Sequence, residues 1–171
     1  MLDEIDASVP EALVILNTAI ANGYFDFPNR KVQAHENFRV VACANTYGLG
    51  GNDVYVGRNQ LDGASLDRFA VIYFDYDPIL EKNLVVSQEW ADFVQTLRAR
   101  IHQRQIKHIV SMRATIYGDK LIQAGTSINT ILMQVIFKNL QPDDVKSIGT
   151  LTNNDNNEYI HAYNDFVENC C

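Results

Sequence analysis

The stretch that decides the fold is FRVVACANTYGLGGNDVYVGRNQLDGASLDRFAVIYFDYD, residues 38–77. It begins with an apolar run of strand length, 38–45, and it ends with a second such run, 69–77. A glycine-rich loop lies between the two runs. Nearly continuous apolar runs are typical of strands that are buried on both faces of a parallel sheet. The stretch therefore predicts an α/β fold in which these residues form later strands of a parallel sheet.

The residues before this stretch predict a helix followed by a hairpin. Ser8 is placed to cap the helix, with Pro10 in the first turn and Glu11 three residues after the cap. Gly23 then ends the helix, because glycine readily takes the left-handed conformation that follows a helix. The alternating residues 24–37, which a Pro-Asn pair interrupts, predict a β-hairpin.

After residue 77 the apolar residues recur at helical spacing. The clearest stripe comprises Trp90, Phe93, Val94, Leu97 and Ile101. Ser111 is placed to cap a second helix, a third stripe begins at Ile128, and Pro142 opens a short helix. Tyr159 and the apolar residues after it predict one more helix in the tail. These patterns divide the chain into an α/β part at 1–77, an all-helical domain at 78–150, and a polar linker with a tail at 151–171.

Composition excludes several classes of protein. The chain has 171 residues, of which 47% are hydrophobic, and its net charge is −7. An acidic chain does not attract phosphate backbones, so nucleic acid is not indicated as a partner. No apolar run is long enough to span a membrane, and the N-terminus does not have the pattern of a signal peptide. The three cysteines make no disulfide framework, which favours the cytoplasm, and Cys43 is expected to be a small core residue.

Acidic and amide side chains at strand ends form the first candidate site. In P-loop NTPases an apolar strand ends in an Asp that holds Mg²⁺ and a Glu that polarises the attacking water, as Asp3 and Glu4 would here. Asn45 ends the run 38–45, and open α/β sheets place ligand-contacting groups at the carboxyl ends of their strands. Each feature has a common structural alternative, because such residues also occur in ordinary solvated turns.

Two arginines are further candidates. Arg68 directly precedes the run 69–77, where its guanidinium can reach the γ-phosphate held by a neighbouring subunit. The alternative is a surface arginine that pairs with Asp62 or Asp67. Arg113 lies in the first turn of a helix, where it can meet a phosphate beside the helix N-terminus. The alternative here is an exposed arginine with no ligand.

Together these motifs resemble the AAA+ ATPases, and among them the MoxR-like and dynein-related group. The resemblance covers about residues 1–150. It is carried by DEIDAS, the hairpin, FRVVACANT, GRNQLDGASLDRF and SMRA, in the order that the family uses. Each motif is weak alone, and their shared order makes the signal specific. The resemblance implies a partial AAA+ P-loop NTPase core, with the later strands of its parallel sheet, followed by an all-α helical lid.

The resemblance also implies a role for each candidate. Asp3 and Glu4 correspond to the Walker B pair, with Asp3 holding Mg²⁺ through water and Glu4 orienting the attacking water. Asn45 corresponds to sensor 1, and Arg68 to an arginine finger that acts on the next subunit. Arg113 corresponds to sensor 2 in the lid. The hairpin corresponds to the pre-sensor-1 insertion, and the implied cofactors are ATP and Mg²⁺.

One element of the family is missing from the sequence. The Walker A loop, G-x-x-x-x-G-K-[ST], does not occur, and the glycine-rich residues 48–53 have no lysine after them. Without that loop, backbone N–H groups and a lysine that would hold the β- and γ-phosphates are absent. We therefore expect a fragment that starts inside the Walker B motif, because of a truncated gene, a wrongly assigned start or a cloning boundary. We expect this fragment to be inactive on its own.

The function expected for the intact protein is ATP hydrolysis by a ring oligomer, a hexamer by the resemblance, that remodels a partner protein. Two alternatives remain open. One is a GTPase subunit of a DNA-restriction system, because selectivity for the base lies mostly in the missing part. The other is a remnant that has lost catalysis and acts as a binding scaffold. The basic helical residues 98–108 are expected to be a solvated face, with a partner patch as the alternative.

Overall fold

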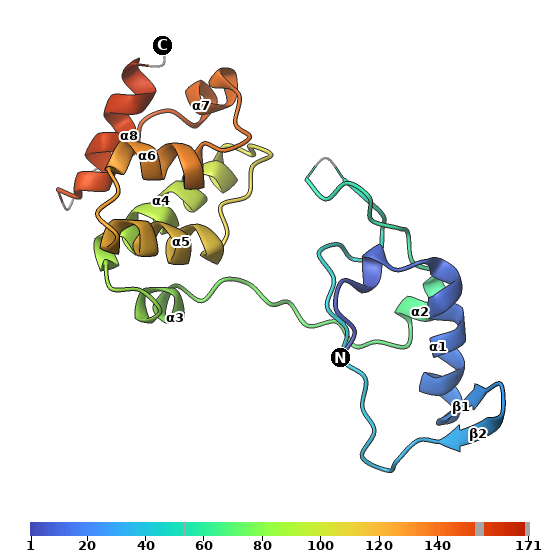
Figure 1. The fold of residues 1–171 in the computed structure, drawn as a ribbon. Helices are drawn as coiled ribbons and strands as arrows, with labels where there is room; N and C mark the ends of the chain where they lie inside the picture. Colours follow the sequence, from blue (N-terminus) through green and yellow to red (C-terminus); the bar gives the residue numbers. More distant parts are fainter. Residues whose placement is uncertain (53, 153–155, 170–171) are drawn as a thin grey trace. The chain divides into compact units, whose positions relative to one another are not determined.

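The architecture comes from a computed structural model that describes residues 1–52, 54–152 and 156–169. The chain forms two compact units, Met1–Tyr73 and Phe74–Cys171, which are described separately here (Figure 1). About 49% of the chain is helical, and the sheet in the described residues has two antiparallel strands. The expected boundary between the first two parts lay after residue 77, and the division between the units falls after Tyr73.

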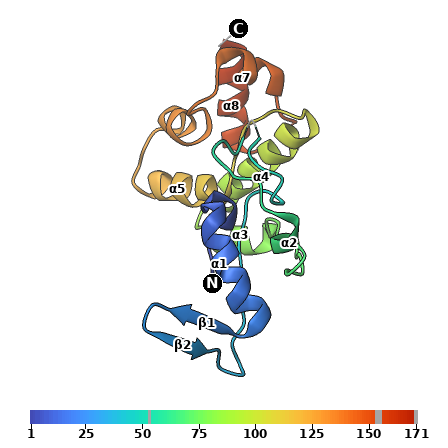
Figure 2. The same cartoon turned by 90° about the vertical axis from the view of Figure 1, so that its right-hand side faces the viewer.

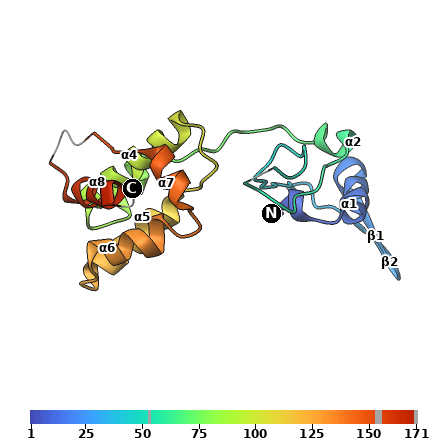
Figure 3. The same cartoon turned by 90° about the horizontal axis from the view of Figure 1, so that it is seen from above.

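In the first unit a helix leads directly into a hairpin. α1 spans Pro10–Asn22 and ends at Gly23, whose φ of 68° is a conformation that glycine adopts without strain. β1, Tyr24–Phe27, pairs with β2, Arg30–Gln33, across the turn at residues 28–29. The predicted hairpin is confirmed, and it extends from the end of α1 (Figure 2 and Figure 3).

The rest of the first unit is irregular apart from two short helical turns. These are η1 at Ile5–Ala7 and α2 at Gly63–Leu66. Asp62 caps α2 by accepting hydrogen bonds from the backbone N–H groups of Ala64 and Ser65. The bond from Ala64 is the main reason that the pKa of Asp62 lies below its ordinary value. The core of this unit is small, and its buried apolar members are Ile5, Leu13 and Leu61.

The predicted parallel sheet is wrong. Of the residues 38–45, only Ala42 pairs with another strand-like residue, in an isolated parallel bridge to Leu2. Residues 70–77 belong to no helix, strand or turn, and Phe69 lies in a bend. The apolar pattern favours strands, but a strand also needs neighbours that satisfy its N–H and C=O groups. The described residues do not supply those neighbours, so they do not form a multistranded P-loop core.

Two local predictions in the first unit are also wrong. Val9, not Ser8, is the N-cap of α1, and no side chain bonds to the first turn. Proline at the start of the helix removes one N–H that a cap would otherwise satisfy, so the cap matters less here. Cys43 is exposed rather than buried, because the run to which it belongs is not covered by a sheet.

The second unit is all-helical. Its elements are α3 at Pro78–Asn83, α4 at Gln88–Gln103, α5 at Met112–Gln123, α6 at Ile128–Ile131, the π-helical turn η2 at Leu132–Ile136, α7 at Pro142–Ile148 and α8 at Glu158–Asn169. α4 contacts α3, α5 and α8 (Figure 1). The predicted cap is confirmed, since Ser111 Oγ accepts a hydrogen bond from the N–H of Arg113 at the start of α5.

The predicted apolar stripe of α4 forms the centre of the second core. Trp90, Phe93, Val94 and Leu97 are fully buried, and Ile101 is 4% exposed. α8 covers this core from the tail, and its buried residues are Tyr159, Ile160, Tyr163 and Val167. The predicted tail helix is therefore confirmed, and it belongs to the helical core. Within the expected linker, residues 153–155 lie outside the described residues, as do Cys170 and Cys171.

Glycine allows α4 and α5 to approach each other closely. Gly118 on α5 faces the indole of Trp90, and a Cβ atom at Gly118 would overlap that ring. The Nε1 of Trp90 donates hydrogen bonds to the carbonyl oxygens of Ala114 and Thr115, at 3.3 and 3.1 Å. Among the described residues, no helix combines the length and the apolar character that a membrane span requires.

Candidate functional site

A short parallel pairing brings two of the predicted site residues into one neighbourhood. Leu2 N–H donates to the carbonyl oxygen of Val41 at 2.8 Å, and Cys43 N–H donates to that of Leu2 at 2.9 Å. A further bond runs from the N–H of Ile5 to the carbonyl oxygen of Cys43, at 2.9 Å. Both segments run in the same direction, so Glu4 and Asn45 follow the pairing at the same end.

Asp6 is the residue that connects these two segments. Its side chain is fully buried. Its Oδ2 accepts hydrogen bonds from the N–H groups of Asn45 at 3.2 Å and Thr46 at 2.9 Å, and from Thr46 Oγ1 at 2.8 Å. Three donors on one oxygen satisfy a carboxylate that would otherwise be costly to bury. Asp6 therefore fixes the backbone at Asn45 against the N-terminal acidic turn.

Arg58 joins the acidic turn to the glycine-rich loop. Its Nη1 lies 3.3 Å from Oδ1 of Asp6, and its Nη2 lies 3.2 Å from Oε1 of Glu4. The hydrogen bond to Glu4 is the main reason that the pKa of Arg58 is raised, and the charges of Asp6 and Glu4 add to it. Burial acts in the opposite direction. The side chain of Arg58 is only 12% exposed, so it packs against this cluster and joins the loop to it.

Glu4 differs from Asp6 in both exposure and backbone. Its side chain is 59% exposed, so its carboxylate reaches solvent while Oε1 contacts Arg58. Its φ of 51° and ψ of 45° are left-handed, which is uncommon for a residue other than glycine. Asp3 supports this turn, because its Oδ1 accepts a hydrogen bond from the N–H of Glu4 at 3.0 Å. The turn thus presents two carboxylates at the surface, beside Asn45.

These carboxylates are of the ligand type that Mg²⁺ prefers, but they are too few to hold the ion by themselves. Exposed carboxylate oxygens are the ligands that Mg²⁺ takes from proteins, usually one or two of them together with substrate phosphates and water. Asp3 fits that description. The described part of the chain contains no group of three or more His, Cys, Asp or Glu side chains that could hold a metal by themselves. A Mg²⁺ ion here would need ligands from a nucleotide.

The two predicted arginines are each described within their own unit. Arg68 belongs to the first unit and is exposed, and its Nη1 donates to the carbonyl oxygen of Ala64 on α2. The described residues provide no salt bridge for Arg68. Arg113 belongs to the second unit and is also exposed. Within the first unit the structure therefore brings the segments of Asp3, Glu4 and Asn45 together, and the bond of Arg68 is to Ala64 rather than to these residues.

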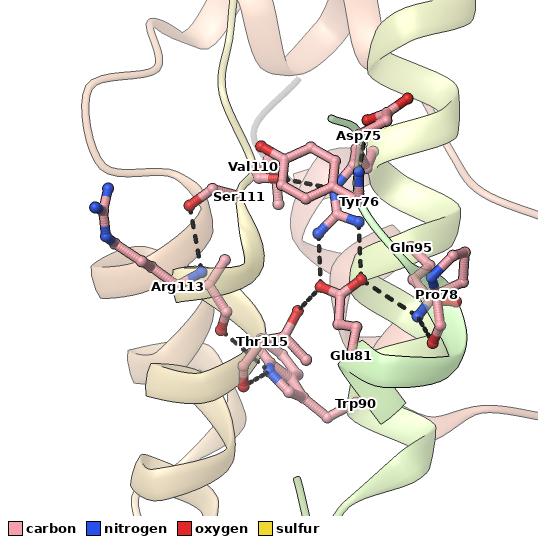
Figure 4. Close-up of polar contacts among 12 residues, drawn as sticks. Asp75, Tyr76, Pro78, Glu81, Trp90, Gln95, Val110, Ser111, Arg113 and Thr115 are labelled. Atoms are coloured by element: carbon pink, nitrogen blue, oxygen red, sulfur yellow. Dashed lines mark hydrogen bonds and ion pairs between the residues drawn. The ribbon is translucent and has the colours of Figure 1, made fainter. Parts of the chain in front are cut away.

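A buried ionic network contacts the first turn of α5, which is the turn that carries Arg113. Glu81 on α3 is fully buried, and its carboxylate receives two bonds from Arg98, at 2.7 and 2.9 Å. Thr115 Oγ1 donates a short hydrogen bond to the same carboxylate, and Gln95 Nε2 donates at 3.3 Å. Figure 4 shows the Arg113 side chain pointing away from this network.

The charge of Glu81 is stabilised by its partners. Burial alone would raise the pKa of this carboxyl group, but hydrogen bonds from Arg98 and Thr115 and the Arg98 charge outweigh it. The net result is a pKa below the ordinary value. Arg98 is itself fixed, because its Nε donates to the carbonyl oxygen of Val110 at 2.7 Å and its guanidinium lies 4.1 Å above the ring of Tyr76.

The sequence analysis did not identify the residues that connect the cluster around Asp6 or the buried network around Glu81. Asp6 and Arg58 lie inside DEIDAS and GRNQLDGASLDRF, so the motifs contained them, but only the fold shows that they contact each other. The sequence gives little indication that Glu81 is buried, because one acidic residue in a short amphipathic helix is usually solvated. Its burial follows from Arg98, which lies 17 residues later in the chain.

Comparison with known proteins does not add to this description. No family model matches the chain, and no curated protein matches it.

Proposed function

We propose that this chain provides the water-activating part of an AAA+ ATPase that hydrolyses ATP as a ring and remodels a partner protein. The proposal rests on the motifs and on the cluster around Asp6. It concerns the roles of residues and does not need a multistranded sheet, which the described residues do not form. We further propose that the chain works in the cytoplasm, as its cysteine content suggests.

The observation that carries the proposal is the convergence of Glu4 and Asn45. Their segments are far apart in the sequence, yet Asp6 bonds to the N–H of Asn45 while Arg58 contacts both Asp6 and Glu4. We infer that the exposed carboxylate of Glu4 and the side-chain amide of Asn45 hold the water molecule together. Such an arrangement suits a site in which one group polarises the attacking water and another fixes its position.

The proposed mechanism gives each residue one task. Glu4 accepts a hydrogen bond from the attacking water, and Asn45 orients that water toward the γ-phosphate. Asp3 would hold Mg²⁺ through water, and that ion would neutralise charge on the phosphates. Arg68 of one subunit would stabilise the charge that develops in the site of the next. Arg113 would contact the nucleotide from the helical unit.

The chain alone is proposed to be inactive. Phosphate affinity in P-loop NTPases depends on the backbone N–H groups and the lysine of the Walker A loop, which the sequence does not contain. Any nucleotide bound to the acidic turn would be held by a few exposed groups that water also solvates. Nucleotide binding should therefore be weaker than micromolar, and turnover should be absent.

The test supplies a Walker A segment to the chain. A strand–G-x-x-x-x-G-K-[ST]–helix segment is joined to the N-terminus, which gives what we call the extended protein, and hydrolysis of ATP and GTP is measured. We expect hydrolysis that Glu4→Gln abolishes while nucleotide binding persists, and that Glu11→Gln on the exposed face of α1 leaves intact. If the extended protein binds nucleotide and the Glu4→Gln variant hydrolyses it equally fast, Glu4 does not have the proposed role.

A binding scaffold is the second candidate, and one contact favours it. Oε1 of Glu4 is already engaged by Arg58, which is anchored on the buried Asp6. A carboxylate oxygen held in this way is less available to accept a hydrogen bond from water, because Arg58 already occupies it. In that case the extended protein would bind nucleotide without hydrolysing it, and the partner protein would bind in the absence of nucleotide.

A further inference from the structure

The segment that follows α2 exposes a continuous apolar surface. Val71 is 69% exposed, Ile72 83%, Tyr73 79% and Phe74 98%. These residues belong to no helix, strand or turn, and Figure 1 shows no strand arrow between α2 and α3. Residues of this kind are enriched in strands, and a large exposed apolar patch marks an interaction site.

The backbone of this segment is also unpaired. Among the described residues, no hydrogen bond involves the backbone N–H or C=O groups of residues 70–74. The nearest bonds are from the N–H of Phe69 to Leu66 and from the N–H of Tyr76 to the side chain of Asp75. An extended segment with free N–H and C=O groups is a template for strand pairing.

The charged residues at the two ends of the segment indicate which partner segment would pair with it. Arg68 precedes the apolar residues and Asp75 follows them, and both are exposed. Neither forms a salt bridge within the described residues. In an antiparallel pair of two identical segments centred between Val71 and Ile72, Arg68 of one copy lies opposite Asp75 of the other. The same register places Phe69 opposite Phe74, so the two ends match in charge and in apolar character.

We propose that two copies of the chain associate through residues 68–75 as an antiparallel, two-fold symmetric strand pair. Each copy then supplies Arg68 to one ion pair and Asp75 to the other, as an isologous interface requires. Parallel in-register pairing is disfavoured, because it places arginine on arginine and aspartate on aspartate. The inference goes beyond the proposed function, since it requires neither nucleotide nor a ring, and an Arg68 that pairs with Asp75 of a second copy is not at the same time available to a γ-phosphate.

The other exposed apolar run does not have this property. An antiparallel self-pairing of residues 38–45 would place Arg39 opposite Ala44, with no charge partner. Part of its backbone is already bonded to Leu2. Residues 68–75 can therefore pair with a second copy of themselves with matched charges, whereas residues 38–45 cannot. A substitution at Arg39 in the second run can serve as a matched control.

The test is a charge exchange in the full chain, with mass in solution measured by sedimentation equilibrium from about 1 to 200 μM. We expect a wild-type dimer. R68D should weaken dimerisation at least about tenfold, because it turns two attractive cross-strand pairs into repulsive ones. D75R should do the same, and the R68D/D75R double variant should restore the wild-type affinity. R39D is the control and should dimerise like the wild type.

Three results would overturn the proposal. The first is a wild-type chain that stays monomeric at about 200 μM. The second is association that R68D does not weaken, which would mean that the apolar residues associate without this register. The third is a double variant that remains as weak as the single variants. Because these side chains are exposed, the substitutions should leave circular dichroism and the fluorescence of Trp90 unchanged, which shows that the variants remain folded.

Discussion

Asp6 and Arg58 form an ion pair across 52 residues of sequence, with 3.3 Å between Oδ1 and Nη1. Asp6 is fully buried, and it also accepts hydrogen bonds from the backbone of Asn45 and Thr46. One side chain thus connects the N-terminal turn, the end of the apolar run and the glycine-rich loop. The first unit has a small core, so this polar cluster has a large share in its organisation.

Asp6→Asn should therefore destabilise the first unit. The amide keeps the size of the carboxylate but removes its charge. Its NH₂ group must face either Arg58 or the three donors that meet Oδ2, so at least one buried donor loses its acceptor. A buried donor without an acceptor costs about 1–3 kcal/mol. The measurement is amide hydrogen exchange of residues 45–61. We expect faster exchange there, and the exposed hairpin variant Asp26→Asn should leave exchange at wild-type rates.

In the second unit, substitution of Glu81 tests how much the buried ionic network contributes to stability. Glu81→Ala removes one member of a buried ion pair and leaves Arg98 without its carboxylate, which typically costs about 3–5 kcal/mol. Unfolding in urea, followed by the fluorescence of the single tryptophan, Trp90, reports on this unit. The neighbouring Lys82 forms an ion pair with Asp92 that is partly exposed. Lys82→Met should change stability by less than about 1 kcal/mol, and equal losses for both variants would contradict the assigned burial.

His108 predicts a pH dependence of the second unit. Its Nε2 lies 3.0 Å from the carbonyl oxygen of Ile136, and burial lowers its pKa below the ordinary value of 6.5. The hydrogen bond to Ile136 and the charge of Asp144 oppose this shift, and Lys138 adds to it. Because the unfolded chain binds the proton more readily, stability from neutral His108 is complete above about pH 6.5 and is lost as the pH falls through the lower folded pKa.

The measurement is the urea midpoint of the second unit between about pH 8 and pH 5. The wild type should lose stability toward acid, and His108→Gln should reduce that loss. The exposed His161 is the control, and His161→Gln should keep the wild-type slope. A slope that His108→Gln does not change would show that other groups cause the pH dependence.

Gly118→Ala tests the close approach of α4 and α5. Its added Cβ atom would overlap the indole of Trp90, so the helices must separate or Trp90 must leave its hydrogen bonds to the α5 carbonyl groups. Overpacking of a core typically costs about 1–3 kcal/mol. Thermal unfolding should show a lower midpoint and altered tryptophan fluorescence. Gly63→Ala, where a Cβ atom meets no neighbour, should leave both unchanged.

The helical unit could be predicted from the sequence because its signals are local. The spacing from Trp90 to Ile101 identifies the buried face of α4, and Ser111 identifies the start of α5. The π-helical turn at Leu132–Ile136 and the burial of Glu81 were not predictable in this way. Both depend on contacts between helices that the order of residues along the chain does not reveal.

The sheet could not be predicted correctly for a different reason. Apolar residues at 38–45 and 69–77 indicate extended backbone, but they do not identify the strands that must pair with it. In the described chain, Leu2 is the only such neighbour of the first run, through one isolated bridge. Asp3, Glu4 and Asn45 still come together because that bridge, Asp6 and Arg58 are sufficient to connect their segments.

The central claim is that Glu4 and Arg68 act on the same ATP molecule from adjacent subunits. In the extended protein, Arg68→Ala and Glu4→Gln should each lose hydrolysis and keep ATP binding, since an arginine of this kind contributes about 10³ to 10⁵ in rate. The most direct measurement is the ATPase rate of a mixture of these two variants. A mixed interface pairs an intact Glu4 with an intact Arg68, so the mixture should recover part of the activity. A mixture that co-assembles but remains inactive, or an Arg68→Ala variant that hydrolyses ATP normally, would contradict the claim.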